Sequence, residues 1–154
     1  MRPVWLVTLG LMAVAGRLAG EQVTVLVPSS VSFYVSDVSA PTSAGSVNVS
    51  FSGASLGAGK ALRIGVRASG ASLSTPAGAA IGTSSITWTT TGASGGSGSG
   101  GTLNSGSFST VYQSVGNPTS GSVSLSFRLA PPGAGVKAVE QSLALEWLFE
   151  SVAQ

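Results

Sequence analysis

The most regular feature of this sequence is the alternation of apolar and polar residues over short runs. Residues 122–129 alternate strictly, with serine or arginine between the apolar positions Val123, Leu125, Phe127 and Leu129. Because successive side chains of a β-strand point to opposite faces, this run predicts a strand with one buried and one solvated face. Similar runs, separated by proline and glycine, occupy residues 23–27, 31–35, 47–51, 62–68 and 86–89, with a less regular one at 108–112.

The C-terminal segment is compatible with two elements. Apolar residues occupy every second position at Leu143, Leu145, Trp147 and Phe149, which predicts a strand. Residues 136–154 are also rich in Ala, Glu, Gln and Leu, and apolar residues at positions 136, 139, 143 and 147 would form one stripe of a helix. We favour the strand, because the alternation is tighter and the preceding Pro and Gly residues suit a turn into a closing strand.

These runs predict an all-β domain, an immunoglobulin-like antiparallel β-sandwich of seven or eight strands. One internal segment does not fit the alternation. Residues 91–101 read TGASGGSGSGG and contain a single apolar residue, Ala93. So little apolar surface does not offset the entropy lost on ordering, and we expect a mobile loop between strands.

The first twenty residues have the pattern of a signal peptide. Arg2 precedes an uncharged apolar run, residues 4–16, which is too short to span a hydrocarbon core of about 30 Å as a helix. Small residues around Arg17 favour cleavage after Gly16 or Gly20; the alternative is an N-terminal membrane anchor. We expect residues 1–20 to be removed, which leaves one secreted domain, residues 21–154, without a membrane span. A chain of that length can form a single core.

Removal of the leader changes the charge balance. The chain has seven basic and five acidic residues, and Arg2 and Arg17 belong to the leader, so five of each sign remain. A domain of zero net charge has no general attraction for nucleic acid. Charged residues make up 8% of the chain, far below the roughly 25% of average proteins. The solvent faces must therefore be built from Ser, Thr, Gly and Asn, as where subunits pack against each other or a matrix.

The sequence lacks the groups of conventional catalysis. Residues 53–57 and 92–96 match the nucleophile-elbow pattern, but the chain has no histidine to act as the base. On a strand, Glu146 and Glu150 would stand about 13 Å apart, beyond the roughly 5–10 Å that glycosidases use. Without Cys or His, and with Asp37 as the one aspartate, a zinc, copper or calcium site is not expected. We predict no catalytic residue, cofactor or metal.

Two groups of residues form the candidate binding surface. The first is the basic cluster of Lys60, Arg63 and Arg67, in which the two arginines share the outer face of one predicted strand on either side of a glycine. This cluster would contact an anionic surface glycan or lipid headgroup. Alternatively, the arginines pair with Glu146 or Glu150 on a neighbouring strand, or prevent aggregation through an exposed sheet edge.

The second group is aromatic. Trp88, Tyr112 or Tyr34 would supply the stacking surface if the domain binds carbohydrate.

Three stretches of the sequence resemble a known class of proteins. The run from Val23, residues 46–68 (SVNVSFSGASLGAGKALRIGVRA) and residues 122–147 (SVSLSFRLAPPGAGVKAVEQSLALEW) resemble secreted bacterial β-sandwich proteins and, more distantly, the spore-coat-U and archaic chaperone–usher pilin type. The resemblance implies an immunoglobulin-like subunit, with other envelope or pilus subunits or surface glycans as partners. The chain has no cysteine pair and enough predicted strands to close its own sandwich, so we favour a self-complete domain.

Together these observations predict a non-enzymatic structural or adhesive component of a bacterial cell envelope, secreted, periplasmic or at the cell surface. The alternative is a carbohydrate- or partner-binding module. An enzyme is the least favoured class.

Overall fold

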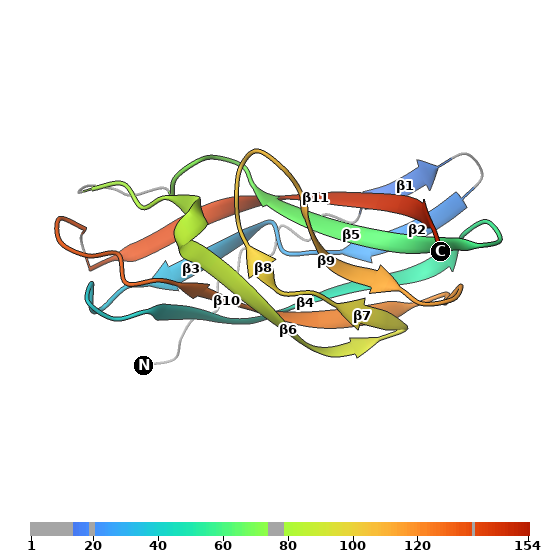
Figure 1. The fold of residues 1–154 in the computed structure, drawn as a ribbon, viewed down its shortest axis with the longest axis horizontal. Coiled ribbons are helices and arrows are strands. Elements are labelled where there is room, and N and C mark those ends of the chain that lie inside the picture. Colours follow the sequence, from blue (N-terminus) through green and yellow to red (C-terminus); the bar gives the residue numbers. More distant parts are fainter. Residues whose placement is uncertain (1–13, 19–20, 74–78, 137) are drawn as a thin grey trace.

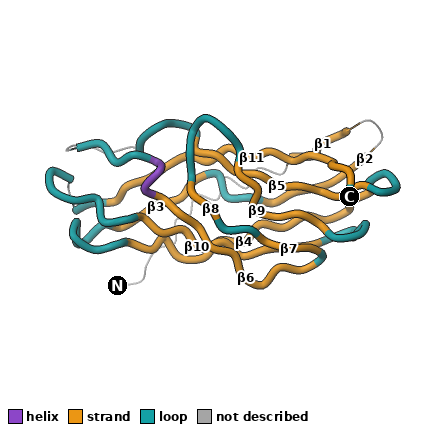
Figure 2. The backbone as a smooth tube through the Cα atoms, viewed as in Figure 1, coloured by secondary structure: helices purple, strands orange, loops and turns teal. Residues whose placement is uncertain are grey.

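The computed structural model describes residues 14–18, 21–73, 79–136 and 138–154. Within these residues the chain is all-β, with eleven strands and a single 3-10 turn, Thr83–Ser85 (Figure 2). The strands form two antiparallel sheets that enclose the apolar core (Figure 1). The predicted all-β sandwich is therefore confirmed. The strands number more than the seven or eight expected, because β1 and the short strands β7 and β8 add to the alternating runs.

The sheets share the strands almost equally. In order, the first sheet contains β1 (Val14–Leu18), β2 (Glu21–Leu26), β4 (Thr42–Ser55), β10 (Gly121–Leu129), β6 (Ile86–Ser94) and β8 (Gly101–Thr102). The second contains β3 (Ser30–Tyr34), β11 (Glu140–Ala153), β5 (Lys60–Ala68), β9 (Ser109–Ser114) and β7 (Gly96–Gly98).

The connections cross between the sheets at every step. From β2 to β11, each strand lies in the opposite sheet to the strand before it. In an immunoglobulin sandwich, by contrast, several consecutive strands, such as F and G, share a sheet. The immunoglobulin-like part of the prediction is therefore not confirmed. Alternation assigns the faces of a strand but not its partners, which is why the sequence did not show this.

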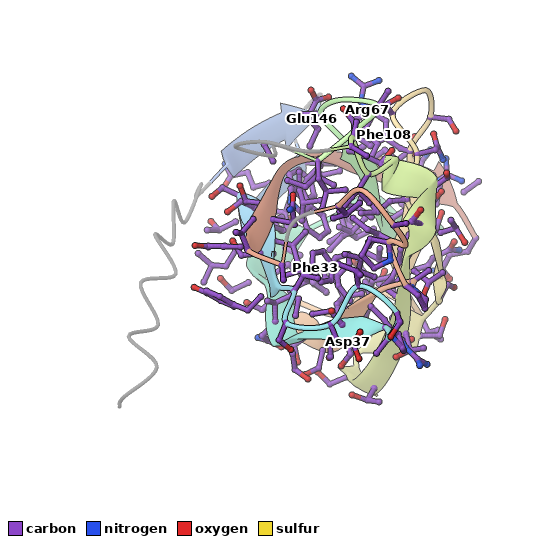
Figure 3. The ribbon with its side chains drawn as sticks, turned by 90° about the vertical axis from the view of Figure 1, so that its left-hand side faces the viewer. Phe33, Asp37, Arg67, Phe108 and Glu146 are labelled. Carbon is purple, nitrogen blue, oxygen red and sulfur yellow. The ribbon has the colours of Figure 1, made fainter. Side chains whose placement is uncertain are left out.

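The core is built from the inward positions of the alternating strands. Val123, Leu125, Phe127 and Leu129 of β10 are fully buried, and Phe33 packs into the same core from β3 (Figure 3). The C-terminal segment is a strand, as favoured, and not a helix: β11 spans residues 140–153. Its inward Leu143 and Leu145 are buried, while the outward positions of the strand face solvent.

Residues 91–101 are not a loop, which corrects the expectation from composition. They complete β6, form β7 and begin β8, and we call residues 94–102 the glycine clasp. Trp88 donates its indole N–H to the Ser99 carbonyl at 2.8 Å, and the Tyr112 hydroxyl donates to the Ser94 carbonyl at 2.8 Å. A Cβ at Gly96 would lie 2.2 Å from the Gln113 carbonyl oxygen. Glycine therefore serves here for close packing, which compositional reasoning does not detect.

The predicted leader coincides only in part with the described residues. Residues 1–13 and 19–20 lie outside them, whereas Val14–Leu18 form β1. β1 pairs antiparallel with β2, from Val14 opposite Val25 to Leu18 opposite Glu21. Cleavage and export stay predictions. No helix within the described residues is long and apolar enough to cross a membrane.

Candidate functional site

The outer face of the first sheet is a lattice of small hydroxyl side chains. Because the apolar positions of β4, β6 and β10 point inward, the polar residues that alternate with them point outward, whereas Thr90, opposite the buried Leu125, points inward. We define the hydroxyl face as Thr24, Ser46, Asn48, Ser50, Ser52, Thr87, Thr89, Thr91, Ser122, Ser124 and Ser126.

The strand register aligns these side chains in rows across the sheet. Ser126 lies opposite Ser46 on one side and Thr89 on the other, and Ser124 lies between Asn48 and Thr91. The Oγ atoms of Ser46 and Ser126 are 2.9 Å apart and share a hydrogen bond. The exposed Arg128, opposite Thr87, adds one positive charge at the end of these rows. Each hydroxyl both donates and accepts, so the face can exchange hydrogen bonds with any polar, hydrated surface.

The outer face of the second sheet is charged instead. Arg67 of β5 lies opposite Glu146 of β11, and their Nη2 and Oε2 atoms are 2.6 Å apart. Four residues away along β5, Arg63 lies opposite Glu150 and donates its Nε–H to Oε1 of Glu150 at 2.6 Å. The alternative that the arginines pair across neighbouring strands is confirmed. Half-exposed pairs of this kind contribute up to about 1 kcal/mol each.

Lys60, the third member of the basic cluster, lies apart from these two rows. It begins β5 opposite Ala153, near the end of β11.

An aromatic ring adjoins the ion pair of Arg67 and Glu146. The guanidinium carbon of Arg67 lies over the Phe108 ring, 4.5 Å from its centroid, which is a cation–π contact. Figure 3 shows Arg67, Phe108 and Glu146 together on the same side of the domain. Asp37 lies on the opposite side in that view, away from the charged face.

Between the two ion pairs the surface forms a hollow, which we call the slot. It has a volume of about 460 Å³ and is lined by Arg63, Gly65, Ser107, Phe108, Thr110, Leu148 and Glu150. In the register, Gly65 lies opposite Leu148 on one side and Thr110 on the other. Because Gly65 has no side chain, its backbone forms the floor of the slot. A Cβ at Gly65 would lie 3.3 Å from the Cβ of Phe108.

The prediction is wrong for two aromatic residues of the binding surface, because both are buried. Trp88 is 2% exposed and Tyr112 is 1% exposed, so neither can stack on a ligand. Both point into the core, where their polar atoms hold the glycine clasp, and burial raises the pKa of the Tyr112 hydroxyl. Tyr34, at the end of β3, is 68% exposed and is the aromatic of the three that a ligand can reach.

Two carboxylates stabilise local backbone. Glu21 accepts a hydrogen bond from the Gly57 N–H at 2.7 Å, and this bond lowers the pKa of the carboxyl group. Asp37 accepts bonds from the Ser39 hydroxyl at 2.6 Å and the Ser39 N–H at 2.8 Å, which lower its pKa likewise. Both groups therefore act as anionic acceptors in turns. The described residues contain no group of three His, Cys, Asp or Glu side chains that could hold a metal ion.

Comparison of the chain with protein-family models, with curated proteins and with solved structures finds no match. The resemblance to spore-coat-U and pilin-type proteins therefore stays a prediction.

Sequence reasoning missed the slot, although the sequence carries a signal for it. Gly65 is flanked two residues away on each side by Arg63 and Arg67, and Leu148 is flanked in the same way by Glu146 and Glu150. Two strands with complementary charges at the same spacing can pair with the small and apolar residues in one row. Only the register shows that they do.

Proposed function

We propose that this chain is a non-enzymatic structural or adhesive component of a bacterial cell envelope, secreted or surface-associated. The hydroxyl face is the observation that carries the proposal. Its rows of Ser, Thr and Asn present neither a charged cluster nor an apolar patch, so the face suits broad contact with a hydrated polymer or a neighbouring subunit.

The pairing of the terminal strands supports a self-complete unit. β2 pairs with β4, and β11 pairs with both β3 and β5, so the strands that could be lent to a neighbour are used within the chain. A unit of this kind contacts other molecules through its faces. The predicted leader accounts for delivery outside the cytoplasm.

A second candidate function is a carbohydrate- or partner-binding module. The slot favours it, because the slot combines apolar and hydrogen-bonding groups in one hollow of the charged face.

The test of the envelope proposal is co-sedimentation with envelope isolated from the bacterium that encodes the chain. Wild-type protein is expected to sediment with the envelope, and the double variant Thr89→Glu, Ser124→Glu is expected to stay in the supernatant. The two glutamates place charge on the hydroxyl face at positions that are not direct cross-strand partners.

The matched control places the same two charges elsewhere. Ser69→Glu, Ser120→Glu changes exposed residues outside the hydroxyl face, and it should sediment like the wild type. Loss of sedimentation in both double variants would show that net charge, and not the hydroxyl face, governs association. Absence of wild-type sedimentation contradicts the proposal.

A further inference from the structure

The slot combines a small apolar surface with hydrogen-bonding groups. Leu148, 36% exposed, and Phe108 supply carbon surface on either side of Gly65, where the backbone itself is the floor. Arg63 and Glu150 line the same hollow. Four of the seven lining residues are polar or charged, so the hollow places several groups that can orient a ligand beside a small apolar surface.

The polar groups retain capacity for a ligand. The Arg63 guanidinium has five N–H donors, and its pairing with Glu150 engages the Nε and Nη2 atoms. A carboxylate accepts several hydrogen bonds, and the hydroxyls of Ser107 and Thr110 each donate and accept. The slot therefore offers both donors and acceptors within one hollow.

The charges of the slot argue for a neutral ligand. Arg63 and Glu150 neutralise each other, so an anion or a cation would lose hydration without gaining a free counter-charge. A purely apolar ligand would desolvate the Arg63–Glu150 pair and the two hydroxyls without replacing their hydrogen bonds with water. The ligand that matches both conditions is uncharged, rich in hydroxyls and apolar on one face.

The position of the slot argues against a peptide strand. β5 lies between β11 and β9, and the backbone beneath the slot is engaged in the pairing of those three strands. An extended peptide binds by adding to a sheet edge, and the slot lies on a face. Recognition there must therefore rely on side chains and on the surface of Gly65, without backbone hydrogen bonds of the kind that add a strand.

We propose that the slot binds a sugar ring of a neutral glycan. The apolar face of the ring lies on Leu148, Gly65 and Phe108, and ring hydroxyls exchange hydrogen bonds with Arg63, Glu150 and Thr110. The volume of about 460 Å³ is within the roughly 300–1,000 Å³ of small-ligand sites. This inference goes beyond a structural role and does not depend on where the protein is located.

The test is NMR titration of the full chain with cellohexaose, maltohexaose, chitohexaose and mannohexaose. At least one of them is expected to shift the amide signals of Arg63, Gly65, Thr110 and Leu148. Leu148→Ser should weaken binding of that sugar about tenfold, because it removes the apolar wall. Arg63→Gln with Glu150→Gln, which leaves no unpaired charge, should weaken it to a similar degree.

Matched controls make the same chemical changes away from the slot. Val115→Ser converts a residue that is 72% exposed, and Lys60→Gln with Glu140→Gln removes one charge of each sign from the same sheet. Both should bind the sugar like the wild type, and all variants should keep the wild-type dispersion of amide signals.

Several results would overturn the inference. These are no shift with any of the four sugars, shifts confined to Tyr34 or the hydroxyl face, or equal binding by Leu148→Ser. Salt-sensitive binding of polygalacturonate at the slot, or binding of an uncharged Ser-Thr decapeptide in preference to every sugar, would equally assign it to another ligand class. None of these outcomes bears on envelope sedimentation, so the two proposals fail separately.

Discussion

The two long sides of the sandwich are closed in different ways. On one side, β8 extends the first sheet beyond β6 and β7 extends the second sheet beyond β9, so the glycine clasp covers both edges (Figure 1). On the other side, the chain passes through Pro28 from β2 in the first sheet to β3 in the second, and β1 pairs outside β2.

The difference lies in what each closure depends on. The clasp depends on glycines, whose backbone packs against the buried rings of Trp88 and Tyr112. The other side ends on backbone pairing with β1, which belongs to the predicted leader. In a chain that begins at Glu21, β2 would be the edge strand of the first sheet. With six residues it is short, and short edges are one means by which proteins avoid strand recruitment.

The clasp should be the more sensitive side, and Gly96→Ala should have the largest effect. Its Cβ would lie 2.2 Å from the carbonyl oxygen of Gln113, a backbone atom that moves only if β7 and β9 separate. We expect a loss of about 3 kcal/mol in the free energy of unfolding, the upper part of the range for overpacking. Urea unfolding followed by tryptophan fluorescence measures it.

The control for this change is Gly106→Ala. The nearest atom to its Cβ would be Asn104 Oδ1 at 3.9 Å, so the change should stay within about 0.5 kcal/mol. Equal effects at the two glycines would mean that the clasp is not packed.

Tyr112→Phe should have a smaller effect on the same side. It removes the hydroxyl that donates to the Ser94 carbonyl at 2.8 Å and keeps the ring in the core. We expect a loss of about 1 kcal/mol, the usual net contribution of one hydrogen bond. Amide hydrogen exchange in residues 94–102 should accelerate more than exchange in β10. Uniform acceleration across both would argue against a local role for this bond.

On the side of the sandwich that contains β1, β2 and β3, the stability of the fold should depend on pH through Glu21. Its pKa is lowered in the folded state, chiefly by the Gly57 N–H, so ionisation of Glu21 stabilises the fold above the unfolded value of about 4.5. That contribution is lost as pH falls through the lower folded-state pKa. Glu21→Gln should therefore lower the urea midpoint at neutral pH, by less than Tyr112→Phe does, and the difference from wild type should vanish at low pH.

The comparison variant is Glu140→Gln, which makes the same charge change at an exposed position of β11. A Glu21→Gln difference that does not depend on pH, or one matched by Glu140→Gln at every pH, would contradict the role of the Gly57 contact.

The sequence predicted the faces of the strands well and their partners poorly. The apolar positions of β10 are all buried, as alternation requires, and β11 is the strand that its alternation favoured. Which strands pair depends on contacts between distant residues, such as Ser124 with Asn48, which no local pattern contains. The observed strand order, which differs from the predicted immunoglobulin-like one, was therefore not predictable from alternation.

The glycine clasp and the aromatic residues show a second limit. Composition treats glycine as a source of flexibility, yet the space at Gly96 and Gly101 is filled by Gln113 and by the Trp88 ring. The alternation of Ile86 and Trp88 already placed Trp88 inward, so its assignment as a stacking residue conflicted with the pattern that defined its strand. The ion pairs were predictable because a cross-strand register needed only matching spacing of charges.

We propose that residues 21–154 form a complete sandwich that acts through its faces. The most direct test is the molar mass of protein beginning at Glu21, measured by size-exclusion chromatography with light scattering. We expect a monomer over a wide range of concentrations, with the same urea midpoint as the full chain, because β1 pairs only with the outer edge of β2. Polymers that lengthen with concentration, or loss of the fold, would contradict it and would show that the β2 edge needs a strand from elsewhere.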